Sequence, residues 1–491
     1  MTRNLTVRRG AYVDSVTLMQ VSQQISSLPG VRSALVAMAT ELNLDLATSM
    51  GFTLPEHTSP NEMLVAVEAD DDASLDAALA QVDVALTAKA SPSSLSLGGA
   101  PAPLTVRAAA RAAESGVALI STPGQYAFLD AVDAIDAGLH TMVFSDNVPL
   151  AQEVALKRYA EPRGVLVMGP DCGTAVVGGV GLGFANVVRP GPVGIIAASG
   201  TGAQHLMTLL DGVHVGISHC LGVGGRDLAS AVGGASTMRA LDLLASDDQT
   251  KVIVVISKPP DEDVADSVRK HAASTGKPMI FGLLGVGQPD LTATAAHVAE
   301  TLGLSWSSPG HLDGQVDCAR SGGSLRGLFA GGTLCDEAMI ITSSALGTIR
   351  SNIPLEPSWG LEESLASDGH TMIDFGDDRL TQGRPHPMID GSIRAERMRA
   401  EIEDPTCGVL LLDVVLGLGA APDPAAELAP LVEAASAAGV PVVVSVVGTN
   451  DDPQGRAGQA SVLNAAGAWV FFSNAEAARH AIELLAKESD A

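Results

Sequence analysis

The fold is decided by Val193-Gly-Ile-Ile-Ala-Ala-Ser199-Gly-Thr-Gly202-Ala-Gln-His-Leu-Met207, an apolar run that passes through a glycine-rich turn into a helical pattern. It predicts a buried strand, a tight turn and a helix. A helix start of this kind points several backbone N–H groups and the positive end of the helix dipole at one spot. We therefore predict that Ser199, Gly200, Thr201 and Gly202 bind a phosphate or carboxylate. The alternative is that the glycines only allow close packing of a tight turn, and the motif alone does not decide between the two.

The alternation of strand, glycine-rich turn and helix continues along most of the chain. It begins after a linker rich in Pro, Ser and Gly at 89–104, and it predicts parallel sheets covered by helices on both faces. Before the linker, the apolar periodicity of residues 1–88 predicts a small α+β module with strands at 31–38 and 63–69. The three α/β units predicted after the linker span 105–188, 189–318 and 319–491.

Composition narrows the class of protein. The chain has 491 residues, of which 46% are hydrophobic and 17% are charged, so it can form several packed layers and is not a disordered chain. Its net charge of −27 repels nucleic acid and anionic lipid, which we exclude as partners. Five scattered cysteines favour a reducing, cytoplasmic setting without disulfides. No apolar stretch is long enough to predict a signal peptide or a membrane span.

Further residues that follow predicted strands are candidates for anion contacts: Gly224, Gly225, Arg226, Lys258, Gly331, Gly332 and Thr333. The guanidinium of Arg226 suits a carboxylate or phosphate, although an ion pair with Asp227 is the commoner fate of such a residue. Lys258 stands at the carboxyl edge of a strand, where open α/β sheets bind ligands, although a lone lysine there is usually only solvated. The turn at 331–333 repeats the strand, turn and helix design and predicts a second anion site.

His386 lies between two prolines, which keep the backbone extended and stiff and present the imidazole beside Arg384. We predict His386 and Arg384 as catalytic residues. The adjacent Asp377 and Asp378 are candidates for Mg²⁺ binding, but paired loop carboxylates are more often simply exposed. The histidines and cysteines show no metal-ligand spacing, so no structural metal site is predicted.

These motifs also resemble those of a known family. Over residues 105–285 their order is similar to that of the succinyl-CoA synthetase α subunit: Gly169-Pro-Asp-Cys-Gly173, Val193 to Gly202, Gly222-Val-Gly-Gly225 and Lys277-Pro-Met-Ile-Phe-Gly-Leu-Leu-Gly285. The last part of the chain resembles the ligase domain of the β subunit of that enzyme: Gly331-Gly-Thr333, Asp374-Phe-Gly-Asp377 and Gly408-Val-Leu-Leu-Leu-Asp413. The whole chain, with the N-terminal module and Gly383-Arg-Pro-His-Pro-Met-Ile-Asp390, is similar to the FdrA family of acyl-CoA synthetases.

The resemblance implies a Rossmann-like domain of the CoA-binding type at 105–188 and two flavodoxin-like ligase domains at 189–318 and 319–491. It also implies acyl-phosphate chemistry, with CoA as a candidate cofactor beside Mg²⁺. The chain departs from succinyl-CoA synthetases where the loop with their phosphorylated histidine should begin, because Gly285-Val-Gly-Gln-Pro stands there. We therefore do not expect this chain alone to relay phosphate through a histidine to a nucleotide.

The leading function that the resemblance implies is transfer of a carbamoyl group from oxalurate to phosphate, giving oxamate and carbamoyl phosphate in purine-ureide breakdown. The chain would then be one subunit of an oxamate carbamoyltransferase-type enzyme, with partner subunits encoded nearby. The alternatives are an acyl-CoA ligase that takes its nucleotide step from a partner chain, and a non-catalytic scaffold or ligand-sensing subunit. In each case we expect a small anionic ligand, phosphate and a homo- or hetero-oligomer.

The expected roles of the site residues follow from the need to hold two anions close together. The two helix starts, at 199–202 and 331–333, would bind the anions and stabilise the negative oxygen of a tetrahedral intermediate. Arg226 and Arg384 would neutralise phosphate or carboxylate charge. His386 would move a proton to the departing nitrogen.

Overall fold

The computed structural model describes residues 2–9, 13, 15–55, 58–89, 103–111, 116–362, 364–381 and 384–487. They form two compact units, each of which is described by itself. The first unit comprises Met1–Ala113, Ser121–Pro123 and Arg379–Pro385, and the second comprises Glu114–Ile120, Gly124–Asp378 and His386–Ala491. Most of the predicted linker, 90–102, lies outside the described residues. No described helix is long and apolar enough to cross a membrane.

The first unit is a small α+β domain, as predicted. It consists of β1 (Thr2–Arg8), α1 (Ser15–Ser26), β2 (Val31–Met38), α2 (Glu41–Ser49), β3 (Met63–Ala69), α3 (Asp72–Lys89) and the short α4 (Val106–Ala110). The strands form an antiparallel sheet in the order β1-β3-β2. Apolar residues of α1 and α3, such as Val21 and Val82, pack with Val65 of β3 in one core. The predicted strands at 31–38 and 63–69 are confirmed with the same bounds.

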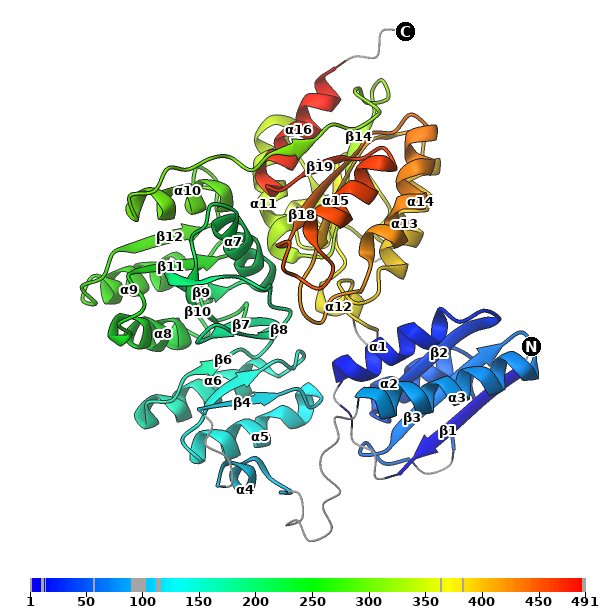
Figure 1. Ribbon diagram of the computed structural model, residues 1–491, viewed down its shortest axis with the longest axis horizontal. Helices are drawn as coiled ribbons and strands as arrows, with labels where there is room; N and C mark the ends of the chain where they lie inside the picture. Colours follow the sequence, from blue (N-terminus) through cyan, green and yellow to red (C-terminus); the bar gives the residue numbers. More distant parts are fainter. Residues whose placement is uncertain are drawn as a thin grey trace. The chain divides into compact units, whose positions relative to one another are not determined.

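The second unit begins with a three-stranded parallel sheet in the order β4-β5-β6 (Figure 1). Its elements are β4 (Val117–Ile120), α5 (Gly124–Asp136), β5 (His140–Val143), α6 (Leu150–Ala160), a 3-10 turn η1 (Glu161–Arg163) and β6 (Val167–Met168). Buried small residues on α5, including Ala127 and Ala131, pack beside Leu156 of α6 and Val143 of β5. Strand and helix alternate here because an apolar strand requires a helix to cover it.

A six-stranded sheet follows in the order β12-β11-β9-β10-β7-β8. Its elements are β7 (Thr174–Val177), β8 (Val180–Gly183), β9 (Pro190–Ala198), α7 (Gly200–Gly212), β10 (Ile217–Gly222), α8 (Ala235–Ser246), β11 (Val252–Ser257), α9 (Glu262–Ala272), β12 (Met279–Leu283) and α10 (Leu291–Thr301). Strands β9 to β12 are parallel, whereas β7 and β8 form an antiparallel hairpin. Figure 1 shows α7 on one face of this sheet and α8 and α9 on the other.

The last sheet has seven strands in the order β13-β19-β18-β17-β14-β16-β15, all parallel except β13. Its elements are β13 (His311–Leu312), β14 (Ser324–Phe329), α11 (Gly332–Leu346), β15 (Arg350–Ser351), η2 (Pro357–Trp359), β16 (Thr371–Asp374), α12 (Asp378–Thr381), α13 (Ser392–Glu403), β17 (Cys407–Val415), α14 (Pro424–Ala437), β18 (Val442–Val447), α15 (Arg456–Ala465), β19 (Trp469–Phe471) and α16 (Asn474–Ala486). Strands β17 and β18 are buried along their whole length, as expected of central parallel strands.

Sheet membership differs from the predicted domain bounds at two places. Strands β7 and β8 were placed in the unit that ends at 188, but β7 pairs with β10 of the six-stranded sheet. Strand β13 was placed in the unit that ends at 318, but it pairs with β19 of the seven-stranded sheet. In both cases the added strand gives hydrogen-bond partners to backbone groups at what would otherwise be a sheet edge.

The order of the strands marks two ligand positions. In the six-stranded sheet the chain runs from β9 to β10 on one side and then to β11 on the other, so the strand order reverses between β9 and β11. In the seven-stranded sheet the order reverses between β14 and β17. Open α/β sheets bind ligands outside the carboxyl ends of the strands at such reversals. These ends lead into Ser199 and Lys258 in the first sheet and into Gly331 in the second.

Candidate functional site

The two predicted anion sites meet at one place. Ser199 caps α7, because its Oγ accepts the N–H of Gly202 at 3.0 Å. The same Oγ donates to Oγ1 of Thr333 at 2.7 Å, and Thr333 is the second residue of α11. The helix starts that follow β9 and β14 therefore face each other across the boundary between the six- and seven-stranded sheets. The sequence predicted both helix starts separately but not their contact.

Glycine is required at this contact. A Cβ atom on Gly202 would lie 3.0 Å from Cγ2 of Thr333, and one on Gly331 would lie 2.9 Å from Cβ and Oγ1 of Thr201. Both distances are too short for a side chain, so the glycines allow the two helix starts to approach closely. This supports the packing alternative that the sequence left open for Gly202, and Gly331 packs in the same way. Such packing does not exclude anion binding, which depends on the remaining N–H groups.

Part of the second anion site is already occupied by the protein. The buried carboxylate of Asp413, in β17, accepts the N–H groups of Ala330 at 2.7 Å and Gly331 at 2.8 Å. Arg394 holds this carboxylate at 2.9 Å. The N–H of Gly331 thus has a fixed internal partner, and the predicted contact of Gly331 with a ligand stays a prediction.

Unused donors remain at the paired helix starts. The N–H groups of Gly200, Thr201, Gly332 and Thr333 donate to no acceptor within the described part of the chain. They belong to the first turns of α7 and α11, where the positive ends of both helix dipoles add together. Two helix starts with unused donors in one place favour a ligand with negatively charged oxygens.

Lys258 adds a cation to this arrangement. Its Nζ lies 3.4 Å from Oδ2 of Asp336, in α11, and a Cβ atom on Gly332 would lie 2.9 Å from the same Nζ. Burial lowers the pKa of Lys258, but the charges of Asp336 and Asp374 outweigh this effect and raise that pKa to about 12. A cation at a helix N-terminus is unfavourable by itself. The negative charges of Asp336 and Asp374 therefore offset this cost and keep Lys258 charged beside the helix starts. An anionic ligand bound there would have the same effect.

Asp374, at the end of β16, is a buried carboxyl group beside Lys258. Its Oδ1 accepts the N–H of Gly376 at 2.8 Å, and its backbone is fixed by two hydrogen bonds with Asn352. Burial raises the pKa of Asp374 to about 7, although Lys258 opposes the rise. The carboxyl group therefore exchanges a proton near neutral pH, as a general acid or base requires. Asp374 was named from the sequence only within the motif Asp374-Phe-Gly-Asp377. Its position at the end of a predicted strand could have indicated a site residue.

His386 lies beside this acid. A Cβ atom on Gly376 would lie 2.9 Å from Nε2 of His386 and 3.1 Å from Oδ1 of Asp374. The Nδ1 of His386 accepts the N–H of Met388 at 3.2 Å, so the proton of the neutral ring is on Nε2. Burial, and next the charge of Arg394, lowers the pKa of His386 to about 4. The ring is therefore neutral at neutral pH. It can donate a hydrogen bond from Nε2–H, but it is not an imidazolium that could act as an acid.

The structure does not test the expected contact of Arg384 and Arg226 with an anionic ligand. Arg384 is exposed in the segment Arg379–Pro385, which belongs to the first unit, so its predicted pairing with His386 stays a prediction. Arg226 donates to Oε2 of Glu153 at 2.9 Å and to the carbonyl of Val148 at 2.9 Å. Its neighbour Asp227 binds Lys157 at 2.8 Å rather than Arg226. Arg226 thus has a structural partner, and its role with a ligand stays a prediction.

The other two predicted glycines have different surroundings. Gly224 has a φ of +88°, and a Cβ atom there would lie 2.6 Å from the carbonyl oxygen of Pro170. Gly225 has open space around such an atom. Gly224 is therefore required by close packing, because only glycine tolerates both this φ and this approach. Neither glycine is linked by a contact to the paired helix starts.

Two acids that the sequence did not single out, Asp171 and Asp146, form a group with Asp378 near Arg226 and Lys258. Asp171 is partly exposed to solvent, and desolvation, and next the charges of Asp378 and Asp146, raise its pKa. Arg226 and Lys258 oppose this rise, which places both cations near the carboxylate. Asp378, a candidate for Mg²⁺, belongs to this group. No set of three or more His, Cys, Asp or Glu side chains among the described residues is arranged to hold a metal ion.

Comparison with known proteins identifies the family. A family model described as an AllF heavy metal-associated domain matches residues 1–101, and a CoA-ligase model matches residues 328–484. Over 518 aligned residues the chain is 34% identical to the protein YahF of Escherichia coli K12, and the match covers 100% of both chains. The chain belongs to the same family as YahF. This is the FdrA-type, succinyl-CoA-synthetase-like family that the motifs resemble.

More distant relatives are named CoA ligases. The chain is 28% identical over 170 residues to the α subunit of malate–CoA ligase from Methylorubrum extorquens, covering 33% of this chain and 56% of that subunit. It is 26% identical over 176 residues to an ADP-forming succinate–CoA ligase α subunit from Archaeoglobus fulgidus, covering 35% and 59%. The fold is thus a Rossmann-like domain followed by two flavodoxin-like domains of the succinyl-CoA synthetase type, with a small N-terminal α+β module. None of these relatives is named a carbamoyltransferase.

The name of the N-terminal family model raises the question of a heavy metal. Soft metals prefer thiolate ligands. Residues 1–101 contain no cysteine and a single histidine, His57, which lies outside the described residues. This domain therefore lacks the cysteine thiolates that would hold a heavy metal.

Proposed function

We propose that the chain transfers an acyl group between phosphate and the thiol of coenzyme A, as an acyl-CoA ligase-type enzyme. The observation that supports it is the contact of Ser199 with Thr333, which joins two helix starts with unused N–H groups beside Lys258. The CoA-ligase model and the CoA-ligase relatives support the same class of reaction.

The phosphoryl group of an acyl phosphate would bind at the paired helix starts. Its charged oxygens would accept the N–H groups of Gly200, Thr201, Gly332 and Thr333 and pair with Lys258. Such donors are fixed before the substrate arrives, so they need no reorganisation as negative charge grows on the phosphate. A donor of this kind contributes roughly a hundredfold or more in rate.

The bond changes are simple. The thiol sulfur of coenzyme A attacks the carbonyl carbon of the acyl phosphate and a tetrahedral intermediate forms. The bond between this carbon and the bridging oxygen then breaks, and phosphate leaves with the electron pair. Asp374, with a pKa of about 7, would take the thiol proton, and the neutral Nε2–H of His386 would donate to the oxygen that becomes negative. In the reverse direction phosphate attacks the thioester.

A nucleotide would enter through a partner chain. The loop at Gly285 lacks the histidine that succinyl-CoA synthetases phosphorylate, so this chain would perform only the acyl-transfer half of a ligase reaction. Partner subunits, oligomerisation and a Mg²⁺ requirement of the nucleotide step remain parts of this proposal. Acyl phosphate and coenzyme A are sufficient for the half that this chain is proposed to perform.

The test is an assay of the full-length chain with coenzyme A and a panel of short acyl phosphates, including acetyl, succinyl and carbamoyl phosphate. Thioester formation is followed by its ultraviolet absorbance and by loss of free thiol. We expect CoA-dependent turnover that falls at least about a hundredfold in Lys258→Met. The matched control is Lys270→Met, on the exposed side of α9, which should leave turnover unchanged.

Two outcomes would overturn the proposal. Phosphate-dependent cleavage of oxalurate without coenzyme A would support carbamoyl transfer in its place. Absence of turnover with every acyl phosphate, in a chain whose circular dichroism and melting curve show it to be folded, would support the scaffold or sensor alternative.

A further inference from the structure

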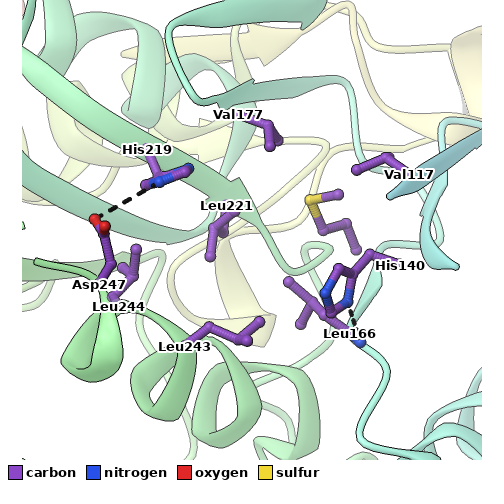
Figure 2. Close-up of a pocket in the computed structure, with 10 residues that line it drawn as sticks. Val117, His140, Leu166, Val177, His219, Leu221, Leu243, Leu244 and Asp247 are labelled. Carbon is purple, nitrogen blue, oxygen red and sulfur yellow. Dashed lines mark hydrogen bonds and ion pairs between the residues drawn. The ribbon is translucent and has the colours of Figure 1, made fainter. Parts of the chain in front are cut away.

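A cavity of ≈ 220 Å³ lies between the three-stranded and six-stranded sheets of the second unit. Its wall is largely apolar and includes Met168, Leu221, Leu243 and Leu244. Figure 2 shows His219 and Asp247 on one side of the cavity and His140, beside Leu166, on the other. A mostly apolar pocket with a few polar groups is the usual form of a small-molecule site.

This cavity is not part of the proposed acyl-transfer site. Val117 and His140 are the first residues of β4 and β5, and Leu166 directly precedes β6. Asp247 follows the last residue of α8. The cavity thus lies at the amino ends of the three-stranded sheet, whereas the paired helix starts follow the carboxyl ends of β9 and β14. A ligand here would touch two sheets and no residue of the Lys258 site.

Both histidines present an N–H donor. His140 accepts the N–H of Leu166 on Nδ1 at 2.9 Å, and burial, followed by the charge of Arg239, lowers its pKa. Its ring is therefore neutral, with the proton on Nε2. His219 accepts the N–H of Gly178 on Nδ1 at 3.1 Å, so its Nε2 also carries a proton. That nitrogen lies 3.7 Å from Oδ2 of Asp247, which is longer than a hydrogen bond.

The charge at the rim selects against anions. Burial raises the pKa of Asp247, but hydrogen bonds from Thr250 and Gln249 and the nearby His219 outweigh this effect and lower it below its ordinary value. The carboxylate is therefore ionised at neutral pH and repels a second negative charge. Because its oxygens already accept three hydrogen bonds from Thr250 and Gln249, it is not an open partner for a cation. An uncharged ligand with a hydrogen-bond acceptor meets these conditions best.

The volume indicates what size of ligand fits. An enclosed cavity of about 150 Å³ lined by Leu, Ile and Phe holds benzene, and this partly open pocket of ≈ 220 Å³ has room for a six-membered ring with a small substituent. We propose that this cavity binds a small, uncharged, ring-shaped carbonyl compound. The ring would fill the space between Met168 and Leu243, and the carbonyl oxygen would accept from Nε2–H of His140 or His219. Binding would hold the two sheets together.

Three compounds with the same ring test the proposal: cyclohexanone, cyclohexane and cyclohexanecarboxylate. Binding to the full-length chain is measured from methyl NMR shifts of Leu221, Leu243 and Met168. We expect cyclohexanone to bind about fivefold more tightly than cyclohexane, because it gains one hydrogen bond. The carboxylate should bind more weakly than either, because of Asp247.

Two variants separate the contributions. Leu243→Phe fills part of the cavity and should abolish binding of all three compounds, whereas Val286→Phe, at a position that is 85% exposed, should change nothing. The double variant His140→Asn with His219→Asn keeps an acceptor for Leu166 and Gly178 but removes both Nε2 donors. It should bind cyclohexane as before and lose the preference for the ketone. Equal affinity for ketone and hydrocarbon in the unmodified chain, or no methyl shift with any compound, would overturn the proposal.

Discussion

His205 and Glu337 occupy the same position in two facing helices and bind each other's domain in the same way. Each is the sixth residue of its helix, α7 or α11. Nε2 of His205 accepts the N–H of Asn474 at 3.2 Å, and Oε1 of Glu337 accepts the N–H of Leu291 at 2.7 Å. Asn474 and Leu291 are the first residues of α16 and α10. The six- and seven-stranded sheets are thus joined by a reciprocal pair of hydrogen bonds beside the helix starts.

Glu337 makes a pH-dependent contribution to stability, and His205, whose pKa is lowered by burial to about 4, makes one of the opposite sign. Burial raises the pKa of Glu337 from 4.5 to about 7. The folded chain therefore holds a proton that the unfolded chain has lost, and stability falls as the pH rises from about 4.5 to about 7. Glu337→Gln removes this contribution, which amounts to about 3 kcal/mol. Between pH 5 and pH 8 the melting temperature of Glu337→Gln should fall by less than that of the unmodified chain. An equal change in both proteins would show that Glu337 does not titrate in this range.

The contact between the helix starts should have a measurable energy. Ser199→Ala removes both the helix cap and the hydrogen bond to Thr333, so we expect a loss of about 2 kcal/mol. Thr333→Val removes only the second interaction and should cost about 1 kcal/mol. Denaturant unfolding of the two single variants and the double variant gives the coupling between the residues. Strictly additive losses would contradict a direct hydrogen bond.

Two helical glycines should tolerate substitution unequally. Gly332→Ala would place a Cβ atom 2.5 Å from Oδ2 of Asp374 and 2.9 Å from Nζ of Lys258, so it must displace one of them. We expect a loss of acyl transfer of tenfold or more, by order of magnitude, because misplacement of a catalytic group by about 1 Å has a large effect on rate. Gly458→Ala, in α15, meets nothing within 4 Å and serves as the control. Equal rates in the two variants would exclude Lys258 and Asp374 from the reaction.

His386 should contribute to rate but not to the pH profile. Because its pKa is lowered to about 4, the ring stays neutral between pH 6 and 8. His386→Gln is expected to lower turnover by about a hundredfold. An inflection near pH 7 should persist in this variant and disappear in Asp374→Asn, since Asp374 is the group with a pKa of about 7. Loss of the inflection in His386→Gln would assign the titration to the histidine.

Local patterns predicted much of the fold. The apolar periods gave β2 and β3 with the observed bounds, and the apolar run at 193–198 is part of β9. The hairpin of β7 and β8 was not predicted, although two glycines at 178–179 between valines are a known hairpin signal.

The site was harder to predict, because its geometry depends on contacts between distant segments. Each helix start was visible from its own sequence, whereas the bond from Ser199 to Thr333 joins residues far apart in the chain. The role of Asp413 was hidden because it lies within an apolar strand, where the sequence shows only an interruption. Lys258 was predicted from its strand end, but its partners Asp336 and Asp374 come from the other sheet.

The six- and seven-stranded sheets are parts of one polypeptide, connected through residues 302–310. Their helix starts therefore meet by an intramolecular step, with an effective concentration set by the connecting segment rather than by the amount of protein in solution. Dilution does not separate the two halves, so the turnover per chain that this contact supports should be independent of protein concentration.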